Sequence, residues 1–228
     1  FDEGGLETEM MQKIAREMHF SETTFITGYD LEKKTFKVRI FTTESELPFA
    51  GHPTLGTAYI AQKELLKDNV EELTLDMKAG LIPVKFNYEG DEPGVLWMTQ
   101  LNPKFGDKHP IEPFAEILGL SVEDFDTDYP IQEVSTGVYF YMVPLKTRAA
   151  LKRVKVDVDK LAEYSNGRKA STPFMFCKEP EDSANHAKAR MMGKGEDPAT
   201  GSANGCFLGY SVKHRYFGGS KVDVNVEQ

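Results

Sequence analysis

Apolar residues at helical spacing mark the first predicted element. Met10, Ile14 and Met18 recur every four positions, and the residues between them are mostly polar. This periodicity predicts an amphipathic helix over residues 7–18.

Short alternating or β-branched runs follow and predict strands. In residues 35–41, Phe36, Val38 and Ile40 share one face, and polar residues occupy the other. Tyr29-Asp30 is the expected turn before this strand. The predicted strands cover residues 23–27, 35–41, 72–77, 82–88, 95–100, 138–145, 174–177, 186–192 and 222–226.

Two stretches rich in small and apolar residues, 54–66 and 203–212, are too long and too poor in β-branched residues to be strands. We expect both to be buried helices. The polar segments 107–112 and 126–130 carry Pro and Asp, and either is suited to join two halves. The predicted division is an N-terminal half over residues 1–107 and a C-terminal half over residues 108–228.

The two predicted buried helices are introduced alike. Residues 48–52 read PFAGH and residues 198–202 read PATGS, with an offset between glycines of 201 − 51 = 150. Upstream, Arg39 and Arg190 each lie in a predicted strand, so each unit runs strand, acidic loop, Pro, Gly and helix. We interpret this ordered self-similarity as an α+β protein of two pseudo-symmetric halves.

The repeat has chemical meaning because a helix N-terminus leaves four N–H groups unsatisfied and carries about half a positive charge. Such an end attracts carboxylate or phosphate groups, and small residues let a ligand approach the backbone. If the halves pack about a pseudo-twofold axis, the two helix entrances would hold one small anionic metabolite between them. His52 and Asp197 would then flank it.

Composition narrows the class of protein. The chain has 228 residues, of which 40% are hydrophobic and 28% charged, and this excludes a disordered or low-complexity chain. The formal charge of −9 makes nucleic acid an unexpected partner. Apolar runs stop well short of the ~18 residues of a membrane span. Two cysteines make no disulfide framework and favour a cytoplasmic location.

Three segments together resemble the phenazine biosynthesis PhzF-like protein family. They are residues 21–25 (SETTF), 46–58 (ELPFAGHPTLGTA) and 196–203 (EDPATGSA). The resemblance covers essentially the whole chain and implies the diaminopimelate epimerase fold, in which each of two similar halves wraps a sheet around a central helix. It also implies a cofactor-independent isomerase with its active site in the cleft between the halves.

The same resemblance assigns roles to six residues. Glu22 corresponds to the acid/base carboxylate, and His52 and Asp197 correspond to its polar partners. Three further positions at the helix entrances are implied to contact the ligand: Gly51, Gly201 and Ser202.

The chain departs from the family pattern at both ends. Family members usually begin with a strand leading into a Gly-Asn-Pro turn and continue beyond the segment that matches residues 226–228. We therefore expect the N-terminal half to be incomplete at its start and the C-terminal half at its end.

Each candidate also has an ordinary structural interpretation. Glu22 lies between a predicted helix and a strand, where a carboxylate is most often solvated or a cap, and His52 alone is a plausible loop histidine. An Asp before Pro is common in turns, so a chemical and a structural role for Asp197 are about equally supported. In favour of chemistry, a partly desolvated Glu can both take and return a proton.

The cysteines weigh against one alternative. Racemases and epimerases of the fold that the resemblance implies use two thiols, one at each helix entrance. In this chain His52 and Ser202 stand near those positions. Cys177 and Cys206 fit core positions instead. No His/Cys/carboxylate spacing supports a metal site, and no glycine-rich pattern supports a nucleotide.

The sequence therefore predicts an isomerase without a cofactor, in which Glu22 moves a proton within a small carboxylate-bearing metabolite. The alternatives are an epimerase with a non-thiol base pair and a non-catalytic binding protein of the same fold. A homodimer through an exposed sheet edge is compatible with the pattern. The substrate itself has no readable motif.

Overall fold

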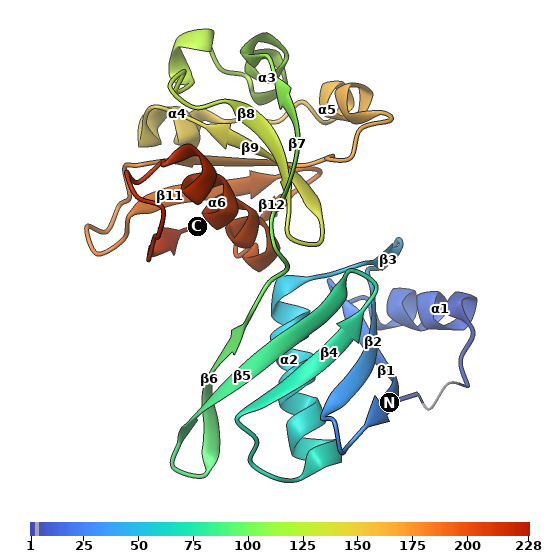
Figure 1. Cartoon of the computed structure of the whole chain (residues 1–228). Helices are drawn as coiled ribbons and strands as arrows, with labels where there is room; N and C mark the ends of the chain where they lie inside the picture. The colour runs from blue at the N-terminus through green and yellow to red at the C-terminus, as the bar shows by residue number, and fades with distance from the viewer. Residues whose placement is uncertain (3–4) are drawn as a thin grey trace. The chain divides into compact units, whose positions relative to one another are not determined.

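The computed structural model describes residues 1–2 and 5–228, which form two compact units, Phe1–Leu101 and Asn102–Gln228 (Figure 1). The boundary expected between residues 107 and 108 would fall inside β7 (Lys104–His109). This strand pairs with β8 (Ile131–Ser135), so residues 102–107 belong to the second unit. The polar segment 107–112 therefore joins a strand to a helix within that unit.

Unit 1 is built on one mixed sheet with the path β1-β2-β4-β5-β6, and β3 pairs with β2. The pairs are antiparallel except β2 with β4. The strands are β1 (Thr23–Asp30), β2 (Thr35–Phe41), β3 (Glu46–Leu47), β4 (Glu72–Met77), β5 (Gly80–Glu89) and β6 (Glu92–Met98).

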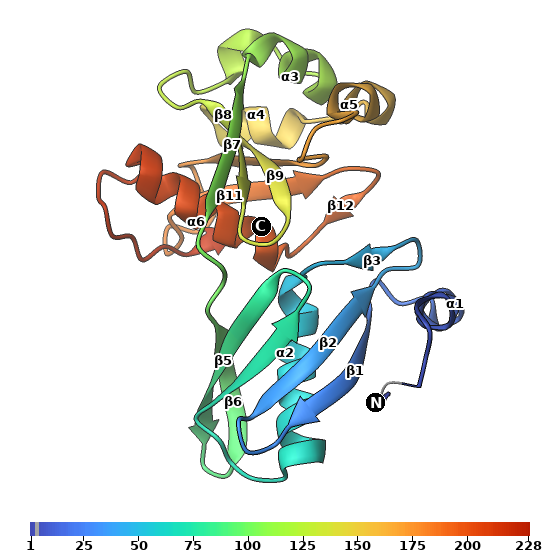
Figure 2. The ribbon, with the colours of Figure 1, turned by 45° about the vertical axis from the view of Figure 1, so that its right-hand side comes forward.

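Helix α2 (Gly51–Ile60) lies against one face of this sheet and continues as a single π-helical stretch, Ala61–Leu66 (Figures 1 and 2). Alternate residues of β4 and β5 are buried, which explains the period-two pattern of their sequences. Helix α1 (Thr8–Met18) covers β1 and β2, where its Met11 and Ala15 pack with Phe25 and Phe41.

Unit 2 has a sheet in the order β12-β11-β10-β9-β8-β7, with β13 paired to β11. Its central pair, β9 with β10, is parallel, and so is β11 with β13. The remaining strands are β9 (Tyr139–Pro144), β10 (Pro173–Cys177), β11 (Ala187–Met192), β12 (Glu196–Asp197) and β13 (Val226–Glu227).

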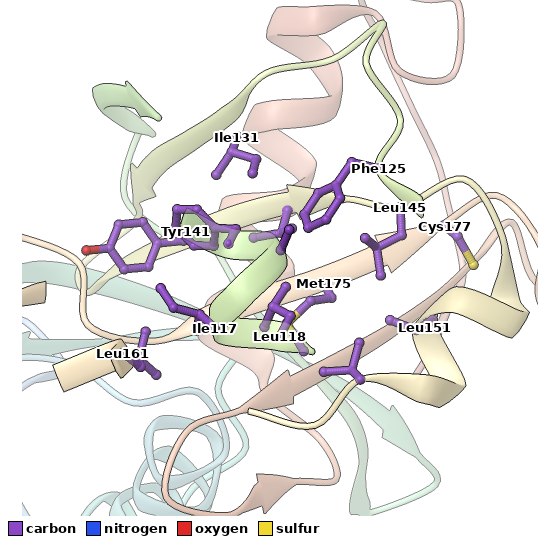
Figure 3. Close-up of a cluster of buried hydrophobic side chains, with 14 of the residues drawn as sticks. Ile117, Leu118, Phe125, Ile131, Tyr141, Leu145, Leu151, Leu161, Met175 and Cys177 are labelled. Atoms are coloured by element: carbon purple, nitrogen blue, oxygen red, sulfur yellow. The ribbon is translucent and has the colours of Figure 1, made fainter. Parts of the chain in front are cut away.

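Helices cover both faces of this second sheet. Helix α6 (Gly201–His214) packs its buried Phe207 and Tyr210 against one face. A second apolar cluster, drawn in Figure 3, fills the space under α3 (Ile111–Leu118), α4 (Arg148–Arg153), α5 (Val158–Ser165) and the short 3-10 helix Val122–Asp124. Every residue of β8 and β10 is buried as a result. In β10 (PFMFC) this burial agrees with an uninterrupted apolar run, whereas β8 (IQEVS) also buries polar side chains.

The α+β class and the two halves are confirmed, and two local expectations are wrong. Tyr29 and Asp30 belong to β1, and the reversal comes one turn later, where Lys34 has a left-handed backbone (φ 50°). Of the strand predicted over residues 222–226, only Val226 is in a strand, β13. Within the described residues, 1–2 and 5–228, no helix has the length and apolar content needed to cross a membrane.

Candidate functional site

The entrance of α2 is shaped by the β2–β3 hairpin. Pairing of Phe41 with Glu46 brings the Glu46 carboxylate to Arg39, which donates from Nε to Oε1 (2.9 Å) and from Nη2 to Oε2 (3.0 Å). The chain then reaches Ala50, the N-cap, whose side chain cannot cap the helix. The first turn of α2 itself contains no acidic residue, so any negative charge at the positive end of the helix comes from other segments.

Glu22 and His52 come together at this entrance. Glu22 directly precedes β1, His52 is the second residue of α2, and 3.1 Å separates Glu22 Oε2 from His52 Nε2. The Glu22 side chain is 18% exposed and that of His52 is 72% exposed. The buried Oε2 has no hydrogen-bond partner among the described residues, although His52 Nε2 lies within ion-pairing distance of it.

Both side chains border a pocket of about 410 Å³ between β1 and successive turns of α2. Its other polar groups include Thr24 and Thr57, which bond to each other (Thr57 Oγ1 to Thr24 Oγ1, 2.9 Å). A buried carboxylate oxygen left without a donor, next to an exposed imidazole, is chemically suited to exchange a proton with a bound molecule.

The entrance of α6 repeats this plan in unit 2. The β11–β12 hairpin pairs Met192 with Glu196, and Arg190 holds the Glu196 carboxylate from Nε (2.7 Å) and Nη2 (2.8 Å). Gly201 begins α6, and Ser202 is buried at 8% exposure. The repeat expected from the sequence therefore exists as matched hairpins, matched ion pairs and matched helix starts.

Asp197, unlike Glu22, has partners for both carboxylate oxygens. Its Oδ1 accepts from the backbone N–H of Ala199 (3.1 Å), and its Oδ2 accepts from the Thr200 hydroxyl (2.8 Å). These bonds close the turn before α6, so the structural interpretation of Asp197 is realised at least in part.

Sequence reasoning missed one residue of this entrance, Gln228. Its side chain bonds with Asp197, Thr200 and Asn204. The residues involved are 24 to 31 positions apart, and nothing in the short segment around Gln228 signals such contacts.

The structure thus brings Glu22 and His52 together within unit 1, and Asp197, Gly201 and Ser202 together within unit 2. The expectation that all of them line one shared cleft stays a prediction.

The two cysteines lie in the core. Cys206 and Cys177 are both fully buried and free. Burial raises the pKa of Cys206 to about 11 and also raises that of Cys177. Neither thiol is poised as a base, which agrees with the expectation against a two-thiol mechanism. Within residues 1–2 and 5–228, no three His, Cys, Asp or Glu side chains gather as metal ligands.

Comparison with known proteins adds three observations. The family model described as "Phenazine biosynthesis-like protein" matches residues 1–228. An uncharacterized isomerase of Clostridium acetobutylicum is 34% identical over 220 residues, 92% of this chain and 72% of that protein. The trans-2,3-dihydro-3-hydroxyanthranilate isomerase of Pseudomonas aeruginosa is 31% identical over 219 residues, 94% of this chain and 73% of that protein.

Among solved structures, a phenazine biosynthesis protein of the PhzF family from Bacillus anthracis superposes with a TM-score of 0.81 at 29% identity. The match covers 100% of this chain and 78% of that one.

Proposed function

The chain belongs to the phenazine biosynthesis-like protein family, whose curated relatives are named isomerases, and we propose that it is a cofactor-independent isomerase of a small carboxylate-bearing metabolite. The observation that carries the proposal is the Glu22 carboxylate, whose buried oxygen lies 3.1 Å from His52 and has no hydrogen-bond partner in the part of the chain that the structure describes.

In the proposed reaction, Glu22 removes a proton from one carbon of the substrate. The electron pair of the broken C–H bond moves into the adjoining unsaturated system, and Glu22 returns the proton to another carbon of the same molecule. Atoms and electrons balance without an oxidant or a reductant. His52 is proposed to orient Glu22 and to hydrogen-bond the substrate.

Binding is proposed to rest on the helix entrances. The N–H groups near Gly51 at the start of α2, and near Gly201 and Ser202 at the start of α6, are suited to a carboxylate. Asp197 is proposed as a fixed polar partner at the second entrance. Because one relative is named the trans-2,3-dihydro-3-hydroxyanthranilate isomerase of Pseudomonas aeruginosa, this compound is the first substrate to test.

The test compares wild type, Glu22→Gln and the control Glu17→Gln on this compound, with product identified by NMR. Glu17 is an exposed residue of α1, so its substitution changes charge equally without touching the site. We expect Glu22→Gln to lose on the order of 10²- to 10⁴-fold in rate, because an amide cannot relay a proton. The control variant should keep its rate.

Turnover by Glu22→Gln within a few-fold of wild type would remove Glu22 from the mechanism. Inversion of a stereocentre, instead of a shifted double bond, would favour the epimerase alternative. Binding of carboxylates without conversion of any of them would favour a binding protein.

A further inference from the structure

The Gln228 side chain makes four hydrogen bonds at the α6 entrance. Its Nε2 donates to the Asp197 carbonyl (2.6 Å) and to Thr200 Oγ1 (2.9 Å). Its Oε1 accepts from the Thr200 backbone N–H (3.0 Å) and from Asn204 Nδ2 (3.2 Å). We infer that Gln228 is a positioning residue, which acts on Asp197 through the Thr200 hydroxyl; the inference rests on the proposed function.

The backbone fixes which way the Gln228 amide points. A backbone N–H can only donate and a carbonyl can only accept, so Oε1 must face the Thr200 N–H and Nε2 must face the Asp197 carbonyl. The opposite orientation would place the Gln228 N–H groups against other donors and its oxygen against other acceptors.

This orientation decides the direction of the Thr200 hydroxyl. The hydroxyl carries one proton, and its oxygen already accepts from Gln228 Nε2. The proton is therefore directed at Asp197 Oδ2, 2.8 Å away. Hydrogen bonds run in one direction, from Gln228 to Thr200 to Asp197, and the Ala199 N–H fills the other oxygen of Asp197.

Neighbouring contacts hold Gln228 in place. Glu227 pairs with Lys188 in the parallel β11–β13 ladder, and its carboxylate accepts from Lys188 Nζ (2.7 Å) and from the Glu181 N–H (2.8 Å). Because the preceding residue is held in this way, the Gln228 side chain can hold the turn before α6 in one geometry.

Unit 1 has no counterpart of this relay among its described residues. Ala50 stands where unit 2 has Thr200, and the turn before α2 is instead held by the Ala79 N–H on the Pro48 carbonyl (3.0 Å). Only the back-bond inside the helix is shared: Thr54 donates to the Ala50 carbonyl as Asn204 donates to that of Thr200. The relay is thus an addition to the duplicated scaffold.

The decisive variant is Gln228→Glu. It is isosteric and still accepts from the Thr200 N–H, but it cannot donate to Thr200 Oγ1 and instead attracts the hydroxyl proton away from Asp197. We expect kcat to fall about tenfold or more while KM changes less, as misdirection of a group beside the reacting atoms would cause. Thermal unfolding verifies that the variant is folded.

A double-variant cycle tests whether the relay is one unit. Thr200→Val and Gln228→Leu should each lower kcat, and the double variant should lose no more than the worse single variant. Thr200→Ser keeps the hydroxyl and should recover most of the activity that Thr200→Val loses. Amide hydrogen exchange at Thr200, which needs no substrate, should speed up in Gln228→Leu.

Unchanged kcat in Gln228→Glu, additive losses in the cycle, or unchanged exchange at Thr200 would each overturn the inference. These results are separable from a failure of the proposed function. Loss of activity in Glu22→Gln with full activity in Gln228→Glu contradicts the positioning role alone, whereas full activity in Glu22→Gln contradicts the proposed function.

Discussion

The two helix entrances share a scaffold and differ in how their polar groups are satisfied. Each follows a β-hairpin with a two-pronged Arg–Glu pair, Arg39 with Glu46 in unit 1 and Arg190 with Glu196 in unit 2. At the first entrance the Glu22 carboxylate keeps a buried oxygen that receives no hydrogen bond from residues 1–2 or 5–228. At the second, both oxygens of Asp197 accept hydrogen bonds.

Under the proposed function, this difference corresponds to a division of labour. A carboxylate whose oxygens already accept bonds is held in one orientation and is suited to fix a neighbour or a ligand. A carboxylate whose buried oxygen has no hydrogen bond among the described residues can gain one when a proton or a substrate arrives. Two similar halves can therefore supply proton transfer and positioning from the same architecture.

The largest expected effect concerns the glycines inside the two central helices. A Cβ added at Gly209 of α6 would lie 2.6 Å from Pro103 Cβ, whereas one added at Gly56 of α2 meets nothing within 4 Å. Gly209→Ala should destabilise by about 1–3 kcal/mol, since a proline ring cannot rotate away. Gly56→Ala should stabilise by about 0.5–1 kcal/mol through helix propensity.

Thermal and urea unfolding of the two glycine variants measure this contrast directly. A stabilised Gly209→Ala would mean that α6 can shift away from Pro103 at little cost, and the tight packing of unit 2 would be in doubt.

A smaller contrast is expected for the stability of carboxylate variants. Asp197→Ala removes the acceptor of both the Ala199 N–H and the Thr200 hydroxyl and should cost about 0.5–2 kcal/mol. Glu22→Gln leaves folding stability unchanged or higher, because the native carboxylate oxygen makes no hydrogen bond that the amide would lose. The unfolding midpoints of both variants test this, and equal losses would contradict the division of labour.

Much of the fold could be predicted because local pattern and burial agree. The predicted ranges 35–41 and 72–77 match β2 and β4 residue for residue, because burial alternates along β4 and along β2 as far as Ile40; Phe41 is buried on the other face, under α1. The turn predicted at Tyr29-Asp30 was wrong because these two residues, each with a polar group, lie at the exposed end of β1 and match the pattern of a turn. The short β13 depends on its parallel partner β11, and no local signal reports such a partner.

Of the candidate site, the helix starts at Gly51 and Gly201 follow from the repeat, and the approach of Glu22 to His52 agrees with the resemblance. Gln228 could not be predicted, because its role comes from hydrogen bonds to residues far away in sequence. In the sequence alone, Gln228 cannot be distinguished from a glutamine on the protein surface.

Acid should distinguish the units as well. Burial lowers the pKa of His109 and of His214, both in unit 2. Below about pH 6.5 these histidines bind protons more readily in the unfolded chain than in folded unit 2. The unfolding free energy of unit 2 should therefore fall as the pH drops below this value. The charged groups around His109 are Glu133, Arg168 and Asp107, and the carboxylates only partly offset the burial.

Urea unfolding at pH 7.0 and 5.5 measures this slope. Fluorescence of Trp97, the chain's one tryptophan, reports on β6 of unit 1, and hydrogen exchange within α6 reports on unit 2. His109→Gln should flatten the dependence seen in unit 2. The same pH slope in both probes, unaffected by this variant, would contradict the assignment to buried histidines.

The smallest expected effect separates the two Arg–Glu pairs. Arg39→Met leaves Glu46 beside Lys78 (3.6 Å), so part of its charge stays compensated, and a partly exposed pair of this kind contributes about 0.5–1 kcal/mol. Arg190 also donates from Nη1 to the carbonyl of Leu151 (2.9 Å), a residue with 1% exposure. Arg39→Met also loses a hydrogen bond, from Nη2 to the hydroxyl of the exposed Thr8 (3.0 Å), whereas Arg190→Met loses its bond to the carbonyl of a buried residue. Because a bond in the less solvated setting is worth more, Arg190→Met should cost about 1 kcal/mol more. The two variants are compared by unfolding in low salt and in 0.5 M NaCl, where charge attraction is screened over about 4 Å. The higher salt should shrink the stability loss of Arg39→Met and leave most of the difference in stability between the two variants. If Arg39→Met and Arg190→Met lost the same stability at each salt concentration, the Leu151 contact would add nothing. The matched pairs would then be equivalent in energy as well as in geometry.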